Sequence, residues 1–391
     1  MEQPVILSAA RTAIGYFQGT LSALGSPQLG AQAIKTAIER AGIAPDAVSE
    51  VIMGQVLAAG VGQAPARQAS IYAGLPKSVP ALTINKMCGS GLKAVMLGAQ
   101  AILTGDADIV VAGGQESMTN APYLLPKARG GYRMGNGEII DSMMYDGLTD
   151  AYEKGPMGAF GDLCAREYKF TREAQDDFAI TSYKRALEAQ KNGWFDAEIT
   201  PLTIQDKKGA VEVKLDEGPG RAQFDKMPGL KPAFSKDGTI TAANASSIND
   251  GAAALVLASA AKAQELGKKP IARIIAQASH AQEPQWFTTA PVGAIKKVLA
   301  KAKLQANDID LYEINEAFAV VPMAAMHDLA IPHEKVNIHG GAIALGHPIG
   351  ASGARVLTTL LHALKRTGKR LGVATLCIGG GEASAVIVEM L

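Results

Sequence analysis

Short apolar runs alternate along this chain with segments whose apolar residues recur at helical spacing. Strand-like runs occur at Val5–Ser8, Glu50–Met53 and Asp108–Ala112. Helical segments lie between them, one at Gly30–Ala41 and another that ends at Ala101–Thr104. Short apolar runs separated by helical segments are typical of strands that are buried on both faces of a parallel sheet. We therefore expect an α/β protein with a largely parallel, buried sheet.

The helical pattern of the first half returns in the second half. In the first half the apolar residues stand at i, i+3, i+4 and i+7, as in an amphipathic helix: Ile34, Ala37, Ile38 and Ala41. The same spacing occurs 261 residues later, at Ile295, Val298, Leu299 and Ala302. The same offset carries Val48 to Ile309 and Gly54 to Asn315. Further along, each half contains a strand, a glycine-rich turn, a helix of small residues and another strand. This repeat predicts two similar halves, and if they pack about a pseudo-dyad their glycine-rich turns meet at the centre.

A segment of different composition separates the two copies. Residues 118–240 are rich in Gly, Pro, Lys and Asp, with a clear helix at Arg172–Asn192 and a turn-rich stretch from Lys207 to Lys236. We interpret this segment as an insertion that covers a site or mediates assembly. The first half would then consist of residues 1–117 and 241–268, with a strand at Asn249–Leu257, and the second half of residues 269–391.

Overall composition excludes several function classes. The formal net charge is +1, so no global charge attracts nucleic acid or an anionic membrane surface. The three cysteines are widely spaced, none with the spacing of a zinc site, and suit a reducing compartment. The N-terminus has no features of a secretory signal, no apolar run reaches transmembrane length, and the last residues carry no address signal. We therefore expect a cytoplasmic protein without a membrane partner.

Cys88 occupies a glycine-rich turn between a predicted strand at Ala81–Ile84 and a predicted helix at Leu92–Leu103. Unpaired N–H groups and the dipole at a helix N-terminus favour a thiolate, so we expect a lowered pKa for this thiol. Gly89 and Gly91 would let the backbone approach a substrate closely. The alternative is a small buried apolar residue, which many free cysteines are.

Three further residues stand at strand ends or in the corresponding turn of the second half. His347, framed by Gly346 and Pro348, could take the proton of the Cys88 thiol and stabilise the resulting ion pair. Cys377 precedes three glycines whose N–H groups could bind an oxyanion, or it is simply a buried strand-end residue. Asn315 could position water or an acyl oxygen, or could cap the helix that follows it.

At these residues the chain resembles the thiolase family over essentially its whole length, and within it the short-chain acetyl-CoA acetyltransferases. The motifs that carry the resemblance are Asn85–Lys86–Met87–Cys88–Gly89–Ser90–Gly91, Asn244–Ala245–Ser246 leading to Asn249–Asp250–Gly251, Asn315–Glu316–Ala317–Phe318, Gly346–His347–Pro348–Ile349–Gly350 and Cys377–Ile378–Gly379–Gly380–Gly381. Five motifs in family order are far more specific than any one of them.

The resemblance implies a reaction and the residues that perform it. Two molecules of acetyl-CoA would be condensed to acetoacetyl-CoA and CoA, or the reverse, through an acyl thioester on Cys88, with His347 as its activating base. Cys377 would remove the α-proton of the second acetyl-CoA or protonate the leaving enolate. One oxyanion hole would use His347 and a water held by Asn315, and the other the N–H groups of Cys88 and Gly379. Coenzyme A would be a substrate or product, with no permanently bound cofactor.

The resemblance also implies a fold: two βαβαβαββ halves in five α-β-α-β-α layers, with residues 118–240 as a loop domain that binds CoA. Ser246 resembles the serine that contacts the pantetheine, and Phe318 resembles a wall of the acyl pocket. Arg221 is a candidate partner of the nucleotide phosphates. Family members of this kind are dimers or tetramers, and we expect a homotetramer built as a dimer of dimers.

The chain departs from the family pattern at two places. Pro156–Met157–Gly158 stands where the family often has His-Met-Gly, which removes an imidazole from the CoA tunnel and leaves Met157 as a pantetheine contact. A segment that commonly contains Met-Gly-Thr-Gly-Pro here begins with Phe287, which would narrow the pocket and favour short acyl chains. A potassium site near Tyr183, with Ala242, Ala243 and Ala245, is also conceivable by resemblance, against ordinary packing of Tyr183 in its helix.

Three alternatives differ from this interpretation in testable ways. A degradative 3-ketoacyl-CoA thiolase would use the same residues on longer chains. A β-ketoacyl carrier-protein synthase would have a histidine or asparagine at the position of Cys377 and a basic surface patch for its carrier protein. A catalytically dead relative that carries lipid or serves as an assembly subunit would have lost Cys88, His347 or Cys377, and all three are present.

Overall fold

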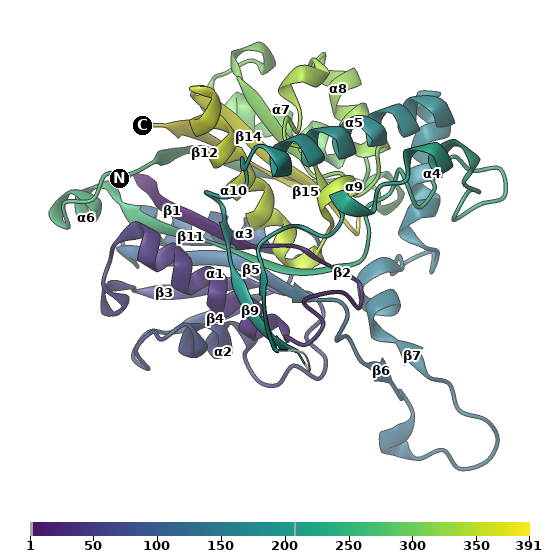
Figure 1. The fold of residues 1–391 in the computed structure, drawn as a ribbon, viewed down its shortest axis with the longest axis horizontal. Helices are drawn as coiled ribbons and strands as arrows, with labels where there is room; N and C mark the ends of the chain where they lie inside the picture. Colours follow the sequence, from purple (N-terminus) through teal and green to yellow (C-terminus); the bar gives the residue numbers. More distant parts are fainter. Residues whose placement is uncertain (1–2, 207–208) are drawn as a thin grey trace.

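The computed structural model describes residues 3–206 and 209–391. An 11-stranded sheet runs through the molecule in the order β13-β14-β15-β12-β1-β11-β5-β3-β4, with β2 paired to β11 and β8 to β1 (Figure 1). Its strands are β1 (Pro4–Thr12), β2 (Gly15–Tyr16), β3 (Glu50–Gly54), β4 (Ala81–Ile84), β5 (Ile109–Ser117), β8 (Ile199–Thr200), β11 (Asn249–Ser259), β12 (Ala272–Ala281), β13 (Leu311–Ile314), β14 (Leu371–Ile378) and β15 (Glu382–Met390). The α/β class is therefore confirmed.

The expectation of a largely parallel sheet is wrong. The long central pairs are antiparallel: β1 with β11 and β12, β11 with β5, and β15 with β12 and β14. Parallel pairing occurs between β3 and both β4 and β5, between β13 and β14, and over two residues between β1 and β8. Helices cover both faces here, so antiparallel strands such as Asn249–Ser259 are buried throughout and read as continuous apolar runs. Burial alone could not reveal strand direction.

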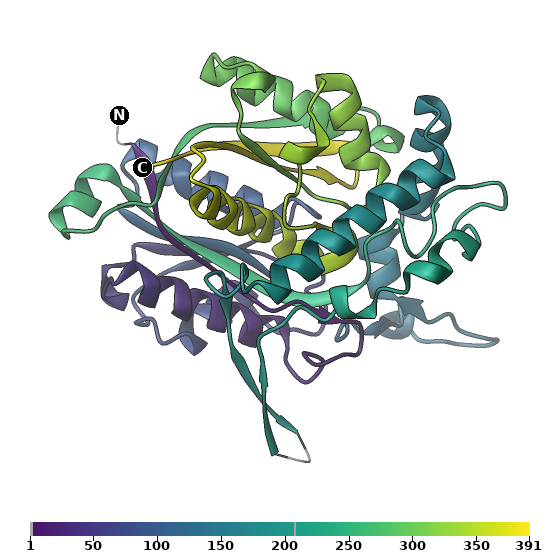
Figure 2. The ribbon, with the colours of Figure 1, turned by 45° about the horizontal axis from the view of Figure 1, so that its top comes forward.

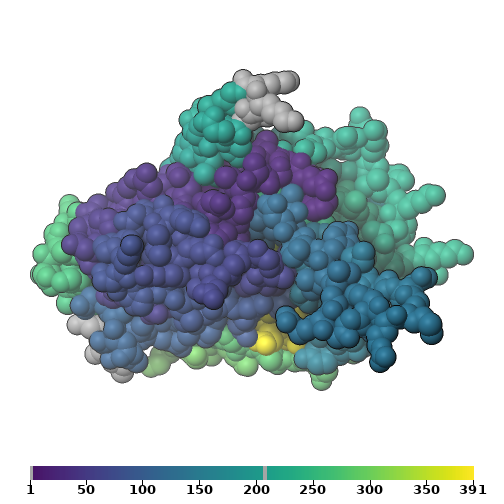
Figure 3. Space-filling view, turned by 90° about the horizontal axis from the view of Figure 1, so that it is seen from below, coloured from purple at the N-terminus to yellow at the C-terminus, as the bar shows by residue number. Residues whose placement is uncertain are grey.

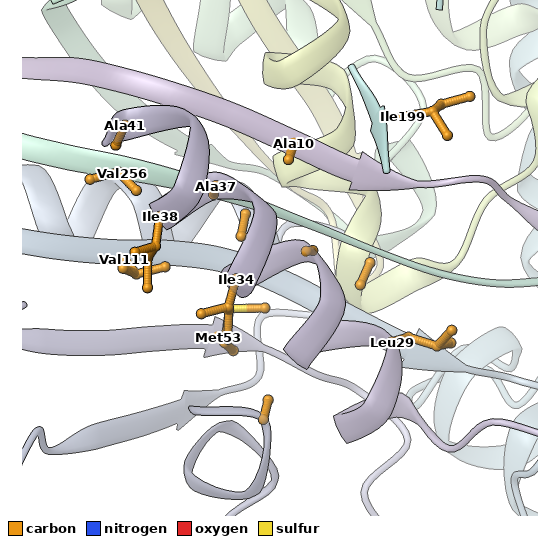
Figure 4. Packing of buried hydrophobic residues seen from close by; sticks show 14 of the residues in the cluster. Ala10, Leu29, Ile34, Ala37, Ile38, Ala41, Met53, Val111, Ile199 and Val256 are labelled. Atoms are coloured by element: carbon orange, nitrogen blue, oxygen red, sulfur yellow. The ribbon is translucent and has the colours of Figure 1, made fainter. Parts of the chain in front are cut away.

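Helices divide the sheet into five alternating layers (Figure 2). Helices α1 (Ser26–Ala41) and α2 (Pro65–Tyr72) form one outer layer, α3 (Ser90–Thr104) and α10 (Ile349–Thr367) the central one, and α7 (Ala290–Ala302) and α8 (Val320–Leu329) the other outer one. In the first outer layer the predicted helical stripe packs on the sheet, with Ile34 and Ile38 near Met53 and Val111 (Figure 4). The central cluster combines residues of both sheet portions with α3 and α10.

The internal repeat is visible in the order of the elements. After α1 come a 3₁₀ turn (Pro45–Ala47) and β3, and after α7 come a 3₁₀ turn (Ala306–Asp308) and β13. The start of β3 at Glu50 and of β13 at Leu311 are separated by the same 261 residues. The central helices α3 and α10 cross in close contact: a Cβ on Gly353 would lie 2.2 Å from the backbone nitrogen of Leu92. This contact brings the two glycine-rich turns together at the centre of the molecule.

The inserted segment 118–240 follows a longer path over the surface. It contains β6 (Tyr123–Leu124), β7 (Ile140–Asp141), a π-helical turn (Met143–Leu148), α4 (Met157–Tyr168), α5 (Arg172–Lys191), β9 (Leu202–Asp206), β10 (Gly209–Val213) and two 3₁₀ turns (Pro219–Arg221 and Phe224–Gly229). Figure 3 shows its first part, in blue, at the surface beside the N-terminal half. The predicted turn-rich stretch thus also holds a strand, and residues 207 and 208 lie outside the described residues.

One segment of the described chain, Met87–Thr104, is long and apolar enough to cross a membrane by length and composition alone. This differs from the expectation that no apolar run reaches transmembrane length. This segment coincides with α3, whose apolar side chains pack in the central cluster between the two sheet portions. We assign it to the core of the protein. The remaining short elements are α6 (Ala260–Glu265), α9 (Ala342–Leu345) and 3₁₀ turns at Ala128–Gly130, Pro284–Trp286 and His333–Lys335.

Candidate active site

Cys88 lies in a tight turn between β4 and α3. The preceding residue, Met87, has a φ of +47°, a left-handed conformation that costs free energy for a side chain other than glycine. The hydroxyl of Ser90 holds this turn, because it accepts a hydrogen bond of 2.8 Å from the N–H of Lys86 and donates one of 2.6 Å to the carbonyl of Met87. Lys86 also forms an ion pair with Glu382, just after the glycines that follow Cys377. The turn is therefore fixed from both halves.

The expected lowering of the Cys88 pKa is wrong as a net effect. Burial raises the pKa of this thiol to about 11, although backbone hydrogen bonds from Gly379 and from Cys88 itself act in the opposite direction, and the carboxylate of Glu116 raises it further. Helix α3 begins only at Ser90, and desolvation of the sulfur outweighs the helix N-terminus. At neutral pH the resting residue is therefore a thiol, and the two N–H groups at its sulfur are available to stabilise negative charge.

His347 lies directly before α10, in the turn that corresponds to the one holding Cys88. Its backbone N–H donates to Oδ1 of Asn249 at 2.9 Å, and its ring nitrogen Nδ1 lies 2.6 Å from the hydroxyl oxygen of Ser352. Burial, together with the positive charge of Arg355, lowers the pKa of the imidazole to about 3. The resting imidazole is therefore neutral, so the predicted thiolate–imidazolium ion pair is not the resting state of this site.

Asn315 and Cys377 stand behind the surface of the site at two strand ends. Asn315 follows β13, and its Nδ2 lies 3.4 Å from Nε2 of His347. It does not cap a helix, since α8 begins only at Val320. Cys377 lies in β14, fully buried, and burial together with the proximity of Cys88 raises its pKa well above the ordinary value of a thiol. The two cysteines thus come from different halves and lie near enough for the charge of one to affect the pKa of the other.

Cys88 and His347 line a cavity of about 830 Å³. Of the residues singled out from the sequence, the lining includes Cys88, His347, Gly379, Ser246, Met157, Phe318, Phe287 and Ala245. Its apolar wall is aromatic: the ring of Phe318 lies edge-on to Phe287 and to Phe234, with centroids 6.3 and 6.0 Å apart. Pro156 also lines the cavity, at the position directly before α4. The cavity is large enough to hold an extended chain against one apolar wall.

Several residues expected at the site do not line this cavity: Asn315, Cys377, Arg221, Tyr183, Ala242 and Ala243. The guanidinium of Arg221 stacks on the ring of Tyr16 at 4.3 Å and pairs with Glu217 at 3.5 Å. The ring of Tyr183 packs edge-on against Phe224 at 6.3 Å, while Ala242 is exposed and Ala243 is buried. Within residues 3–206 and 209–391, no group of three or more His, Cys, Asp or Glu side chains could hold a metal ion.

Three buried polar residues that hold the site together were given no role from the sequence. Glu116, at the end of β5, accepts hydrogen bonds from the N–H groups of Val56, Leu57 and Gly350. Asn249 binds the backbone of His347, and Ser352 contacts its ring. An acidic residue at the end of an apolar strand is the signal that could have identified Glu116. Ser352 gives no such signal, because a serine in a helix of small residues is ordinary.

Comparisons with known proteins cover almost the whole chain. The family model described as the thiolase N-terminal domain matches residues 4–261, and that of the thiolase C-terminal domain matches residues 268–390. The acetyl-CoA acetyltransferase of Cupriavidus necator is 56% identical over the full length of both chains, and the cytosolic acetyl-CoA acetyltransferase of Gibberella zeae is 49% identical over 99% of this chain and 98% of its own.

A solved structure extends the comparison to three dimensions. The crystal structure of the Acat5 thiolase from Ascaris suum in complex with coenzyme A is 47% identical in sequence, covers 100% of each chain, and superposes with a TM-score of 0.95. The layered arrangement of two similar halves that the sequence predicted is therefore confirmed.

Proposed function

The chain belongs to the thiolase family, and we propose that it is an acetyl-CoA C-acetyltransferase that condenses two acetyl-CoA molecules, or cleaves acetoacetyl-CoA, through an acyl thioester on Cys88. One observation carries the assignment of this step. The thiol of Cys88 lines the cavity and receives hydrogen bonds from the N–H groups of Gly379 and of Cys88 itself, and the buried thiol of Cys377, from the other half, lies near enough for its pKa to respond to the charge of Cys88. A covalent acyl donor, a base and an oxyanion site are thus combined without a metal.

In the first half-reaction, the sulfur of Cys88 attacks the thioester carbon of an acyl-CoA. The neutral imidazole of His347 takes the thiol proton as the new carbon–sulfur bond forms, and then gives it to the departing sulfur of CoA. Because both groups are neutral at rest, proton transfer accompanies the attack. The N–H groups of Cys88 and Gly379 stabilise the oxyanion, where donors fixed in place contribute most to the rate.

In the second half-reaction, Cys377 acts as a base toward the next acetyl-CoA. Its thiol first gives its proton to Nε2 of His347, and the resulting thiolate removes a proton from the methyl carbon next to the thioester. The enolate carbon attacks the acyl carbon, the bond from that carbon to the sulfur of Cys88 breaks, and the Cys88 thiolate takes up the proton from His347. Burial makes the thiolate of Cys377 a strong base, as removal of such a proton requires. The enolate oxygen would be stabilised by the Nε2–H of His347, during the time that this nitrogen holds the proton from Cys377, and by a water held on Asn315. Thiolysis follows the same steps in reverse.

The substrate would enter along the wall formed by the inserted segment. We assign Met157 and Ser246 to the pantetheine portion and Phe318 and Phe287 to the acyl end, since all four line the cavity. The Ser246 hydroxyl already donates to the carbonyl of Ala317 at 3.0 Å, which leaves its oxygen free to accept from an amide N–H of pantetheine. Pro156 offers no hydrogen bond at the family's imidazole position, so this contact is made by packing alone.

The segment 118–240 serves in this proposal as the CoA-binding and assembly domain, inserted between residues 1–117 and 241–268, with residues 269–391 as the second half. Arg221 would contact the nucleotide phosphates outside the cavity, after release from Glu217. The packing of Tyr183 against Phe224 supports a structural role, which predicts equal rates with and without potassium. We further propose a cytoplasmic homotetramer.

A thiolysis assay tests the function. Acetoacetyl-CoA, 2-methylacetoacetyl-CoA and 3-ketooctanoyl-CoA are each supplied with free CoA, with and without potassium. Turnover confined to the short substrates supports an acetoacetyl-CoA thiolase with Phe287 as a wall. Comparable turnover of the eight-carbon substrate would instead identify a degradative 3-ketoacyl-CoA thiolase, and no turnover of any substrate would support the carrier or assembly role.

A further inference from the structure

A chain of hydrogen bonds leads from the core to the cavity through His347. The side-chain carbonyl oxygen of Asn315 lies 3.5 Å from Nη2 of Arg355, and its amide nitrogen lies 3.4 Å from Nε2 of His347. On the other side of the ring, Nδ1 lies 2.6 Å from the hydroxyl oxygen of Ser352, which in turn lies 2.9 Å from the carbonyl oxygen of Pro348. All these side chains are at least 95% buried.

Only one arrangement of the hydrogens in this series of hydrogen bonds gives every donor an acceptor. Arginine has only donors, so the group of Asn315 that faces Arg355 must be its oxygen, and the NH₂ group must face His347. An NH₂ group opposite Nε2 requires Nε2 to be the unprotonated acceptor. The proton of the neutral ring then resides on Nδ1 and is donated to Ser352, whose own hydrogen is donated to the carbonyl of Pro348.

Each alternative places two donors or two acceptors against each other. With the proton on Nε2, the ring N–H would face the NH₂ of Asn315. Turning the Asn315 amide would relieve that conflict, but it would direct the NH₂ at the guanidinium of Arg355, which also donates at 3.3 Å to Glu313. In a buried site, a donor or acceptor without a partner is costly, so these contacts favour one tautomer.

We propose that Ser352 and Arg355 are positioning residues that hold His347 in the tautomer with an unprotonated Nε2, the nitrogen that receives the thiol proton. This inference rests on the proposed acyl-transfer function. Neither residue lines the cavity, so both act through His347 and Asn315 and not on the substrate. Arg355 fixes the orientation of the Asn315 amide, and Ser352 accepts a hydrogen bond from the N–H of the other ring nitrogen.

The experiment compares four variants in α10 of the full-length enzyme, one of which is Arg355→Gln. Ser352→Ala removes the acceptor for Nδ1–H, Ser352→Thr retains a hydroxyl, and Thr358→Val is the matched control. Thr358 is a fully buried residue of the same helix, and its hydroxyl has no hydrogen-bond partner among the described residues. The readouts are the single-turnover rate of Cys88 acylation by acetoacetyl-CoA, the steady-state KM and kcat, and the ¹⁵N signals of the histidine side chains, which report the tautomer.

The proposal predicts that Ser352→Ala lowers the acylation rate and kcat about 10- to 100-fold, as loss of an orienting partner commonly does, with KM nearly unchanged. The ¹⁵N signals of His347 would change from one tautomer to a mixture. Ser352→Thr and Thr358→Val would keep the wild-type rate and tautomer. Arg355→Gln, which can donate or accept toward Asn315, would produce the same tautomer mixture.

Two results would overturn the proposal. One is a wild-type acylation rate and an unchanged tautomer in Ser352→Ala. The other is an equal loss of rate in Ser352→Ala and Ser352→Thr with the tautomer unchanged, which would assign the effect to packing of α10. Failure of the proposed function is a separate result, because the wild-type enzyme itself would then form no acyl group on Cys88.

Discussion

The carboxylate of Glu116 accepts a hydrogen bond of 2.9 Å from the backbone N–H of Gly350, and so connects the strand end of one half to the first turn of α10 in the other. The same oxygen accepts from Val56, and the other carboxylate oxygen accepts from Leu57. His347 lies three residues before Gly350. Glu116 therefore fixes the distance between the two turns on which the chemistry depends.

This contact makes a prediction about stability and pH. Burial raises the pKa of Glu116 from 4.5 to about 7, against the effect of its three N–H donors. Between these two values the folded state holds a proton that the unfolded state has released, so the free energy of unfolding falls as pH rises through this window. The contribution of this group to the free energy of unfolding is roughly 3 kcal/mol. Urea unfolding at several pH values measures it.

The variant Glu116→Gln isolates that contribution. It cannot ionise, so its free energy of unfolding should decline less than that of the wild type between about pH 4.5 and pH 7. It also turns an NH₂ group toward one of the N–H donors, so it should be less stable at the acidic end and should acylate Cys88 more slowly. If the free energy of unfolding declined equally with pH in the two proteins across this window, the raised pKa of Glu116 would be contradicted.

The neutral resting state of Cys88 and His347 predicts how the free enzyme reacts with iodoacetamide. Only the thiolate is alkylated, and burial raises the pKa of the Cys88 thiol to about 11 while the pKa of His347 is about 3. The rate of alkylation should therefore rise continuously from about pH 6 to about pH 10. Peptide mapping would assign the label to Cys88. A rate that is independent of pH across this range would instead indicate a resting thiolate–imidazolium pair.

Phe287 offers a prediction about chain length. The residue is 3% exposed, lines the cavity and packs edge-on against Phe318. Phe287→Leu should raise kcat/KM for 3-ketooctanoyl-CoA relative to acetoacetyl-CoA by about tenfold or more, since a few methylene groups in an apolar pocket have effects of this size. Phe160→Leu is the matched control, because Phe160 packs behind Phe287 at 6.4 Å without lining the cavity. An equal change in the ratio of kcat/KM values in both variants would contradict the role of Phe287 as the wall of the acyl pocket.

Much of the fold could be predicted because its helices carry their own periodicity. The helix at Arg172–Asn192 was found as Arg172–Lys191, and the strand at Ala81–Ile84 was found at those bounds. Strand direction could not be predicted, since a strand buried on both faces has the same apolar pattern whether its neighbour is parallel or antiparallel. The internal repeat could be predicted because both copies contain the helix, the 3₁₀ turn and the strand at the same offset of 261 residues.

The sequence indicated only those site residues that directly follow a strand or lie in a glycine-rich motif. Cys88, His347 and Gly379 have this signature, and the structure places them around one cavity. Ser352 and Arg355 do not, because their partners come from elements that meet only in the folded protein. The pKa of Cys88 was misjudged for a related reason: the helix N-terminus can be read from the sequence, whereas the desolvation that outweighs it depends on packing.

The measurement that tests the central claim most directly is mass spectrometry of the enzyme quenched after mixing with acetyl-CoA. Wild type, Cys88→Ala, Cys377→Ala and the control Cys164→Ala are compared, with condensation assayed in parallel. The account predicts an acetyl group on the Cys88 peptide in every protein except Cys88→Ala, and loss of condensation in Cys377→Ala but not in Cys164→Ala. An acetyl group on another residue of the wild type, or normal condensation by Cys377→Ala, would contradict it.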